Sequence, residues 1–252
     1  RESQLEEEMF AIWDIIETFY KAAGFPKLEV RLSLHDPEKM ENYLGEEADW
    51  QRWEDGLRSL AKKRGVEYTE EEGEAAFYGP KIDFMAYDSI GREWQVATIQ
   101  ADRNMPERFN LFCANEDNEQ EQIVMVHAAI MGSIERFMSI LIEHHGGAFP
   151  IWLAPVQAAI LPISDRHLEY AKEVEARGLE LGLRIEVVDT NESLSKKIRN
   201  AQKAKIPYSL VVGDTEAEEK TVAVRRRGEK AQESMSLEDF LEMLVQQNKN
   251  KE

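Results

Sequence analysis

The first part of the chain alternates between helical and strand-like patterns of apolar residues. Residues 1–22 place apolar side chains at spacings of three and four, which predicts an amphipathic helix that ends at Gly24. Residues 28–34 alternate in the manner of a strand, and residues 49–64 predict a second amphipathic helix that stops at Gly65. Because the first helical pattern starts at Arg1 without a preceding cap, we expect the chain to be the interior of a longer protein.

The middle of the chain predicts a hairpin and then a change from strand to helix. β-Branched and aromatic residues fill two runs on either side of residues 88–91, which have a turn-like sequence. Strict alternation in the second run would put Gln95 on one face and both Thr98 and Gln100 on the other. Helical spacing takes over after Gly132, so residues 132–133 are predicted to join a strand to a buried helix.

Arg136 lies in the first turns of that predicted helix. Backbone amides at a helix start favour anions, and a guanidinium group can grip a phosphate or stack on a purine, so one interpretation is a nucleotide site. The other interpretation is an ion pair with the neighbouring Glu135 at the helix start. The pattern alone leaves both open.

A lone histidine, His127, interrupts the strand-like run that precedes Gly132. Such a histidine is typically a core or ion-paired residue, and metal ligation is the alternative. The adjacent pair His144 and His145 does not predict a metal site, because neighbouring residues of a helix point in different directions. Residues 115–122 are polar and acidic and are predicted to form a loop.

From residue 157 onward, predicted strands and helices alternate. Strands are predicted at residues 158–163, 184–188, 208–212 and 221–225, and helices at residues 165–181, 194–205 and 237–247. This alternation is typical of a mainly parallel sheet flanked by helices, with binding groups in the loops at the strand ends.

Composition narrows the class of protein. A chain of 252 residues is long enough for two domains, each with its own core. The single cysteine, Cys113, excludes an internal disulfide and favours a reducing compartment such as the cytoplasm. The most apolar stretch, residues 123–142, is interrupted by charged residues, so no membrane span is expected.

The acidic excess is concentrated in the first part of the chain. Residues 1–156 contain 15 basic and 31 acidic residues, whereas residues 157–252 contain 16 and 18. A net charge of −18 argues against non-specific binding to DNA or RNA, but local basic stripes decide recognition. Two stripes occur, at residues 196–205 and 225–227, and each is either a nucleic-acid contact or a solvated face.

Several segments, in this order and spacing, resemble threonyl-tRNA synthetases. They are residues 77–84, 94–95, 98–100, 106–109 and 132–137. The last is similar to motif 3 of class II aminoacyl-tRNA synthetases, and residues 148–157 resemble the junction to their anticodon-binding domain. The similarity covers essentially the whole chain. A lone motif 3 would be a weak signal, whereas this ordered series is far more specific.

The resemblance implies an α/β fold class with two domains. An antiparallel-sheet class II catalytic domain, truncated at its N-terminus, is expected over residues 1–151, and a three-layer α/β anticodon-binding domain over residues 152–252. Motif 1, the arginine loop of motif 2 and two zinc ligands would lie before Arg1. The chain alone is therefore not expected to catalyse a reaction, and the full-length protein is expected to be a homodimer.

The implied reaction is ATP-dependent activation of threonine, followed by its transfer to threonine tRNA. Such catalysis works by positioning and by neutralising charge, so arginine side chains, Mg²⁺ with ATP and oriented donors are expected. Three residues are implied to act in catalysis and ATP binding: Lys81, Gln95 and Arg136. Five are implied to surround threonine: Tyr78, Val96, Thr98, Gln100 and Ser133.

The resemblance also implies a Zn²⁺ ion. In threonyl-tRNA synthetases the histidine at the position of His127 is one of three protein ligands to a zinc ion that holds the amino and hydroxyl groups of the substrate. The other two ligands would lie outside this chain. A site that must pair the substrate hydroxyl rejects valine.

For RNA, the resemblance implies four contacts to the anticodon. The positions are Asn191, Arg199, Glu216 and Arg225. Nearby lysine side chains are expected to supply a positive field at the RNA surface; they are Lys196, Lys197 and Lys203.

Two residues depart from the family pattern. Val96 stands where cysteine is common, which bears on specificity, and Ala128 stands where arginine is common, which removes a charge beside His127. Two functions therefore remain: part of an active ligase, or a synthetase-like RNA-binding or regulatory protein without catalysis. The retained polar residues favour the ligase; they are Lys81, Gln95, Ser133 and Arg136.

Overall fold

The computed structural model describes residues 1–25, 27–229 and 231–252. The chain forms two compact units, Arg1–Glu143 and His144–Glu252. The domain boundary that we expected after residue 151 stays a prediction. Within the described ranges, no helix is both long and apolar enough to cross a bilayer.

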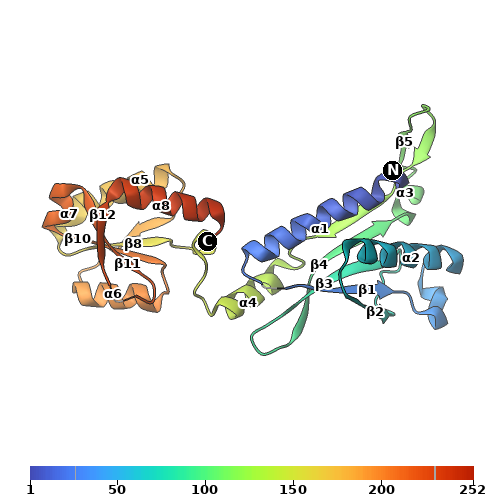
Figure 1. The fold of residues 1–252 in the computed structure, drawn as a ribbon, viewed down its shortest axis with the longest axis horizontal. Helices are drawn as coiled ribbons and strands as arrows, with labels where there is room; N and C mark the ends of the chain where they lie inside the picture. Colours follow the sequence, from blue (N-terminus) through green and yellow to red (C-terminus); the bar gives the residue numbers. More distant parts are fainter. Residues whose placement is uncertain (26, 230) are drawn as a thin grey trace. The chain divides into compact units, whose positions relative to one another are not determined.

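A five-stranded sheet forms the centre of the first unit (Figure 1). In spatial order its strands are β2 (Tyr68–Glu72), β1 (Glu29–Leu34), β3 (Lys81–Tyr87), β4 (Glu93–Asp102) and β7 (Met125–Ala129). Neighbouring strands are antiparallel except β1 and β2, which are parallel. The hairpin predicted around residues 88–91 is confirmed, because β3 and β4 pair on either side of that turn.

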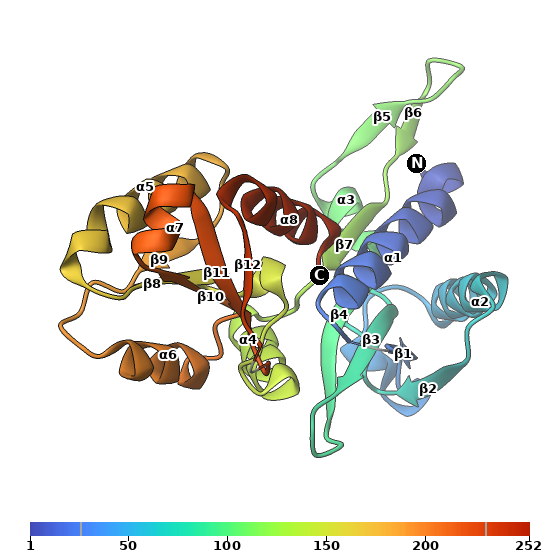
Figure 2. The ribbon, with the colours of Figure 1, turned by 60° about the vertical axis from the view of Figure 1, so that its left-hand side comes forward.

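Two helices, α1 (Leu5–Ala22) and α2 (Glu47–Arg64), cover one face of this sheet (Figures 1 and 2). Both were predicted from their apolar stripes. Trp13 of α1 packs edge-on against Phe84 of β3, with ring centroids 5.1 Å apart, and Trp50 of α2 is fully buried. Gly65 ends α2 with a φ of 72°, a conformation that favours glycine.

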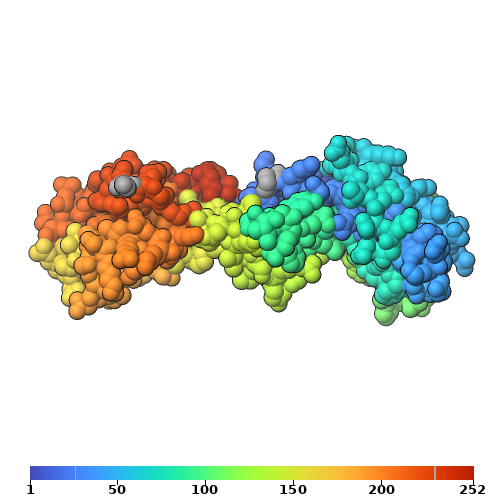
Figure 3. Space-filling view, turned by 90° about the horizontal axis from the view of Figure 1, so that it is seen from below, coloured from blue at the N-terminus to red at the C-terminus, as the bar shows by residue number. Residues whose placement is uncertain are grey.

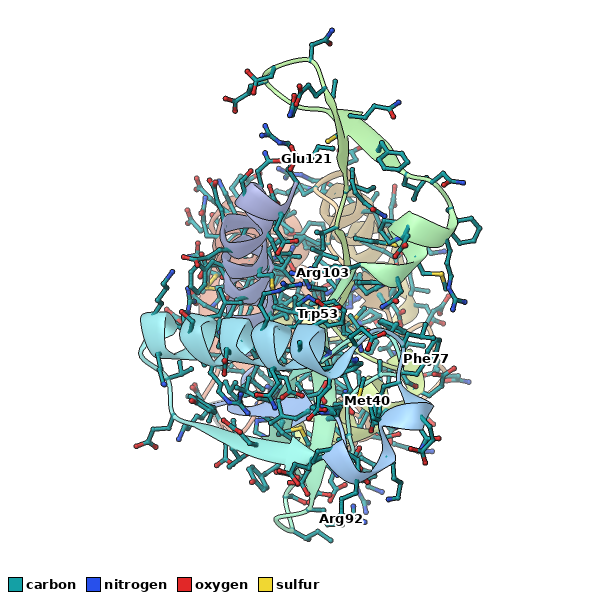
Figure 4. The ribbon with its side chains drawn as sticks, turned by 90° about the vertical axis from the view of Figure 1, so that its right-hand side faces the viewer. Met40, Trp53, Phe77, Arg92, Arg103 and Glu121 are labelled. Atoms are coloured by element: carbon teal, nitrogen blue, oxygen red, sulfur yellow. The ribbon has the colours of Figure 1, made fainter. Side chains whose placement is uncertain are left out.

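Short elements connect these parts. The 3₁₀ turn η1 (Glu2–Gln4) precedes α1, η2 (Pro37–Asn42) joins β1 to α2, and the helix α3 (Asn104–Arg108) follows β4. Arg103, just after β4, places its guanidinium group 5.3 Å from the ring centroid of Trp53 on α2, and the two labelled side chains lie together in Figure 4. This cation–π contact fixes the end of β4 to the helix layer.

The predicted change from strand to helix at Gly132 is confirmed, since α4 (Ile134–His145) follows β7. The expectation that this helix is buried was wrong for one side of it, where Met138 and Ile142 are exposed. Phe137 of α4 packs on α1, with its ring centroid 5.3 Å from that of Phe19. The β3–β4 turn lies beside α4 at the surface (Figure 3), where Ser89 Oγ donates to Glu143 Oε1 at 2.8 Å.

The loop predicted over residues 115–122 is confirmed for residues 115–119, which form a turn, and was wrong for residues 120–122, which form a strand. β5 (Phe112–Ala114) and β6 (Gln120–Gln122) pair in an antiparallel ribbon that extends beyond the sheet (Figure 2). The side-chain oxygen of Asn115 accepts the backbone N–H groups of Asp117 and Glu119, which organises the turn. Neither face of this ribbon is buried in a core, so its strands lack the apolar alternation that identifies a strand in a sequence.

The second unit contains a mixed five-stranded sheet. In spatial order its strands are β12 (Glu233–Ser236), β11 (Thr221–Arg226), β10 (Tyr208–Val212), β8 (Ala158–Pro162) and β9 (Ile185–Val187). β8 is parallel to β9 and β10, whereas β11 is antiparallel to both of its neighbours. The expectation of a mainly parallel sheet was therefore wrong for the half that contains β11 and β12. Residues 213–220 are too few for the crossover that a parallel β11 would need.

Helices lie on both faces of this second sheet, which confirms the expected three-layer α/β fold. α5 (Leu168–Glu180) and α8 (Leu237–Asn250) enclose the larger core, including Val174, Phe240 and Leu244. α6 (Leu194–Lys203) covers the other face through Ala201, against Ala159 and Leu161. The remaining elements are η3 (Ile151–Leu153), η4 (Asp165–His167) and α7 (Asp214–Glu219).

Candidate functional site

The polar residues of the first unit lie in neighbouring rows across its sheet. Lys81 pairs with Ser33 on one side and with Gln100 on the other, and Gln100 pairs with His127. Because successive side chains of a strand point to opposite faces, these residues share the face opposite to that of Phe84 and the helices. The register thus brings polar groups from four strands to one surface.

A buried carboxylate, Asp83, is the centre of this surface. It is only 2% exposed, and its Oδ1 accepts hydrogen bonds from Gln95 Nε2 and Thr98 Oγ1, both at 2.6 Å. Its Oδ2 accepts a hydrogen bond from Ser33 Oγ at 2.7 Å and is also paired with Lys81 Nζ. The sequence placed Asp83 between two candidate residues, but we assigned it no role. Its position in an otherwise apolar strand was the signal that could have found it.

A β-bulge at Val96 aims Gln95 at this carboxylate. The register of β3 and β4 shifts so that Phe84 pairs with Ala97 but Met85 pairs with Gln95, which leaves Val96 without a partner on β3. The extra residue moves Gln95 to the face of Thr98, so the strict alternation expected from the sequence was wrong. The side chain of Val96 is buried, with 2% of its surface exposed.

Two side chains satisfy the backbone carbonyls at the bulge. The Tyr20 hydroxyl donates to the carbonyl of Val96 at 2.9 Å, and Arg136 NH1 donates to the carbonyl of Gln95 at 3.2 Å. Gly132 lies over the same point: it has a φ of 58°, and a Cβ there would be 3.1 Å from the Val96 carbonyl oxygen. The start of α4 is therefore fixed directly to the bulge.

The alternative interpretation of Arg136, an ion pair with Glu135, is not what the structure shows. The Glu135 carboxylate accepts a hydrogen bond from Ser133 Oγ at 2.8 Å, and in the described part of the chain no ion pair joins Glu135 to Arg136. Arg136 is exposed and is held by the Gln95 carbonyl. Its guanidinium group can therefore contact a ligand above the polar face.

Tyr78 and His127 lie together at the other end of the polar rows. The Tyr78 hydroxyl donates to Gln100 Oε1, and the Tyr78 and His127 ring centroids are 5.6 Å apart. Burial raises the pKa of the Tyr78 hydroxyl, and the nearby Asp102 carboxylate raises it further. Tyr78 is consequently a neutral donor across the physiological pH range.

His127 is paired with a buried carboxylate, as the first of the two interpretations from the sequence expected. Its Nε2 lies 2.9 Å from Oδ2 of Asp102, a carboxylate whose side chain is 1% exposed, while the His127 side chain is 40% exposed. A carboxylate on one ring nitrogen orients a histidine so that the other nitrogen can bind a metal. Among the residues that the structure describes, no three His, Cys, Asp or Glu side chains form a complete metal site.

A large cavity in the first unit is on the opposite, helix-covered face. It has a volume of about 1170 Å³ and lies between α1, β1 and β2, with Trp13, Tyr20 and Val30 in its wall. None of the candidate residues lines it. We identify the candidate site by its converging polar groups, because cavity size alone carries no chemistry.

In the second unit, the loops at the carboxyl ends of β8 and β9 lie where the sequence predicted binding groups. α5 follows β8 on one face of the sheet, and α6 follows β9 on the other. Adjacent parallel strands whose helices leave to opposite faces open a crevice at their carboxyl ends. Asn191 is exposed just beyond β9 at this edge, and Arg199 is exposed on α6.

The other two RNA candidates lie on the neighbouring elements. Glu216 is on the short helix α7, where its Oε2 accepts the backbone N–H of Gly213 at 2.9 Å. Arg225 is half-buried on β11, opposite Ser209 of β10. The structure thus places all four candidates on β11 or on segments that follow β9 and β10, without a direct contact between them in the described residues.

One lysine does not contribute to the surface. Lys197 is only 6% exposed, and its Nζ donates to the carbonyl of Pro162 at 3.1 Å, so the expectation that it adds to a surface field was wrong. It lies four residues before Ala201, on the side of α6 that packs on the sheet. Lys196 is exposed and pairs with Glu192 at 2.8 Å.

Comparison with known proteins gives consistent matches. The family model "tRNA synthetase class II core domain (G, H, P, S and T)" matches residues 1–145, and the model "Anticodon binding domain" matches residues 157–247. A threonine–tRNA ligase of Rubrobacter xylanophilus is 50% identical over 242 residues, and one of Acetivibrio thermocellus is 47% identical over 249 residues. These alignments cover 96% and 99% of this chain but 38% of each relative.

A solved structure agrees with these matches. The RNA binding domain of threonyl-tRNA synthetase from Cryptosporidium parvum Iowa II superposes with a TM-score of 0.89 and 35% identity, over 97% of this chain and 61% of that one. The sheet with its polar face corresponds to the core-domain match, and the three-layer unit corresponds to the anticodon-domain match. The chain therefore belongs to the class II tRNA synthetases, and the relatives that it matches over nearly its whole length are threonine–tRNA ligases.

Proposed function

We propose that this chain is part of a threonine–tRNA ligase, which activates threonine with ATP and transfers it to threonine tRNA. The observation that supports this most directly is the polar face around Asp83, where Lys81 and Gln95 converge and the β-bulge holds Arg136. The chain spans 38% of the length of the curated relatives, so the activity belongs to a longer protein.

The candidate residues divide into two groups along this face. Lys81 and Gln95 both bind Asp83, and Arg136 donates to the Gln95 carbonyl; these three residues would contact ATP and the adenylate. The remaining candidates, which would surround threonine, are Tyr78, Val96, Thr98, Gln100 and Ser133. Val96 is buried and apolar, so it would act by shaping the part of the polar face that lies beneath threonine, and not through a polar contact.

The proposed reaction requires no covalent bond between the protein and its substrates. Arg136 and Lys81 would neutralise charge that develops on the α-phosphate, and Gln95 would orient the adenylate. When bound with ATP, Mg²⁺ would supply further neutralisation of phosphate charge. Threonine-dependent exchange of pyrophosphate into ATP by a longer form of the protein tests this proposal, and its absence would favour a synthetase-like RNA-binding or regulatory protein.

We extend the proposal to one Zn²⁺ ion held by His127, with the other ligands outside this chain. The fit is the carboxylate of Asp102 on one ring nitrogen and the exposure of the ring. When bound, zinc would hold the amino and hydroxyl groups of threonine, while Tyr78 and Asp102 keep the imidazole ring in place.

The partners proposed for the whole protein are threonine tRNA, ATP, threonine and a second copy in a homodimer. A cytoplasmic location fits the single cysteine. No DNA or membrane partner is proposed.

His127→Ala in the longer form is expected to remove bound zinc and discrimination against valine together. Wild type should contain about one zinc ion per chain, measured by elemental mass spectrometry. The variant should lose this zinc, because a site with three protein ligands binds the ion weakly when one ligand is missing. Activation of valine relative to threonine should rise by about 10² or more when the hydroxyl can no longer be paired. Stoichiometric zinc in the variant would show that His127 is not a ligand.

Arg225→Ala is expected to weaken binding of the 252-residue chain to a threonine anticodon stem-loop by about 1–3 kcal/mol, with loss of discrimination against a scrambled loop. A base contact carries sequence information, whereas a phosphate contact does not. Lys203→Ala is the matched control, because Lys203 is exposed at the end of α6 and should weaken all RNAs alike and reduce the salt dependence. Equal binding of both loops by wild type would contradict the site.

A further inference from the structure

We propose that Asp83 is the positioning residue of the candidate active site, and that it acts by orienting Lys81 and Gln95. This inference rests on the proposed function. It concerns a residue that makes no contact with substrate, because the carboxylate is buried beneath the groups that it binds. Lys81 and Gln95 would contact the adenylate, and Asp83 would hold them there.

The hydrogen bonds of Asp83 saturate its carboxylate. Two donors converge on each oxygen: Gln95 and Thr98 on Oδ1, and Ser33 and Lys81 on Oδ2. A carboxylate offers about four acceptor positions, so no further protein or solvent donor is needed. Burying an unpaired carboxylate would be costly, and four donors, one of them cationic, compensate for that cost.

The groups that Asp83 holds keep part of their bonding capacity for a ligand. An ammonium group has three N–H donors, and Lys81 uses one on Asp83 while Ser33 Oγ lies 3.5 Å away. Gln95 uses one N–H of its amide and retains its oxygen and its second N–H. A side chain held on one side and available on the other loses little further conformational freedom when a ligand binds.

The bulge at Val96 supports a functional rather than a purely structural role. Replacing a buried ion pair by well-packed apolar residues often leaves the stability of a protein unchanged or raises it. Stability alone therefore does not explain why this sheet keeps a buried ion pair. Here the backbone departs from regular pairing so that Gln95 faces Asp83, and Tyr20 and Arg136 side chains satisfy the carbonyls at the bulge. Bulges that re-aim a side chain are common beside active sites.

The first test uses the 252-residue chain itself and does not depend on catalysis. Side-chain ¹⁵N NMR should detect a slowly exchanging ammonium signal from Lys81 in wild type, because a buried ion pair slows proton exchange. Asp83→Asn should remove that signal. Asp88→Asn is the matched control: Asp88 is also a buried carboxylate with several donors, among them Trp94 Nε1 and Arg92 Nε, but it lies in the β3–β4 turn. An unchanged Lys81 signal in Asp83→Asn would overturn the proposal.

The second test measures exchange of pyrophosphate into ATP in the longer form of the protein. Asp83→Asn is expected to lower kcat by about 10²-fold with a smaller change in the KM for ATP, as for loss of an oriented contact. In a background that carries both Lys81→Ala and Gln95→Ala, the same change should cost less than about threefold, because a residue that acts through these two side chains is coupled to them. Asp88→Asn should leave kcat within about twofold at temperatures where the protein stays folded. An effect of Asp83→Asn that is as large in the Lys81→Ala, Gln95→Ala background as in wild type would overturn the proposal.

A milder variant keeps the proposal falsifiable if Asp83→Asn does not fold. Ser33→Ala removes one donor to Oδ2 and leaves the bonds of Asp83 with Gln95 and Lys81 in place, although it also removes the weaker 3.5 Å contact between Lys81 Nζ and Ser33 Oγ. It should lower kcat by about 3–10-fold in the same direction, the size of one lost hydrogen bond. No change in either kcat or the Lys81 signal would overturn the role. If the wild-type longer form shows no exchange at all, the proposed function fails, and the NMR result still decides whether Asp83 orients Lys81.

Discussion

Arg136→Ala is expected to reduce threonine-dependent ATP–pyrophosphate exchange by about 10²-fold or more in the longer form of the protein. Arg136 is exposed, and the hydrogen bond from its NH1 group to the Gln95 carbonyl places its guanidinium group over the polar face. A preorganised charge at the point where phosphate charge develops contributes mainly to the transition state. Most of the loss should therefore appear in kcat.

Two further variants sharpen this prediction. Arg52→Ala is the matched control, because its side chain is 73% exposed on α2 and pairs with Asp49 at the surface. Arg136→Lys should recover little activity, since an ammonium group cannot reproduce the planar fork of donors. The melting temperature of Arg136→Ala should change little, because one exposed hydrogen bond contributes weakly to stability. Exchange at the wild-type rate would remove Arg136 from the site.

Glu54→Ala is expected to lower the free energy of unfolding by about 3–5 kcal/mol. Glu54 is 4% exposed, and its Oε1 accepts both the backbone N–H of His35 at 3.0 Å and the ring Nδ1 of His35 at 2.7 Å. Removing the carboxylate leaves two buried groups of His35 without a partner, which costs more than the lost contact itself.

Urea unfolding of the 252-residue chain measures this effect. Tryptophan fluorescence reports on the region directly, because the Trp50 ring centroid lies 5.3 Å from that of His35. Asp55→Ala is the matched control: Asp55 is the next residue of α2, its side chain is 73% exposed, and it pairs with Arg58 at the surface. The control should change stability by less than about 0.5 kcal/mol. Equal effects of the two substitutions would contradict the importance of the buried pair.

Some features of the fold were predictable from local sequence because they depend on residues close together in the chain. The apolar stripes of α1 and α2, the glycine that ends α2 and the strand β10 (Tyr208–Val212) lay where the pattern predicted them. Elements without a buried face escaped prediction: β2 (Tyr68–Glu72) is almost wholly exposed, and β5 and β6 form a ribbon in which no side chain is fully buried. The parallel or antiparallel pairing of β11 followed from a connection length that we had not weighed.

The candidate residues of the site could be named from the sequence, through the order and spacing of segments that resemble a known family. Their arrangement could not. Alternation within β4 separated Gln95 from Thr98, because a bulge exists only in the pairing of two strands and leaves no mark in either strand alone. Asp83 gained its importance in the same way, from donors on three different strands.

The same distinction holds for charge. By itself the sequence determined which residues are ionisable and that the acidic excess lies before residue 157. Only the tertiary structure decided which charges face solvent: Lys197 is buried against Pro162, whereas Arg136, two residues into its helix, remains exposed over the polar face. The physical reason is that exposure depends on what packs on each side of an element. That is set by strand order and register, which join residues distant in the chain.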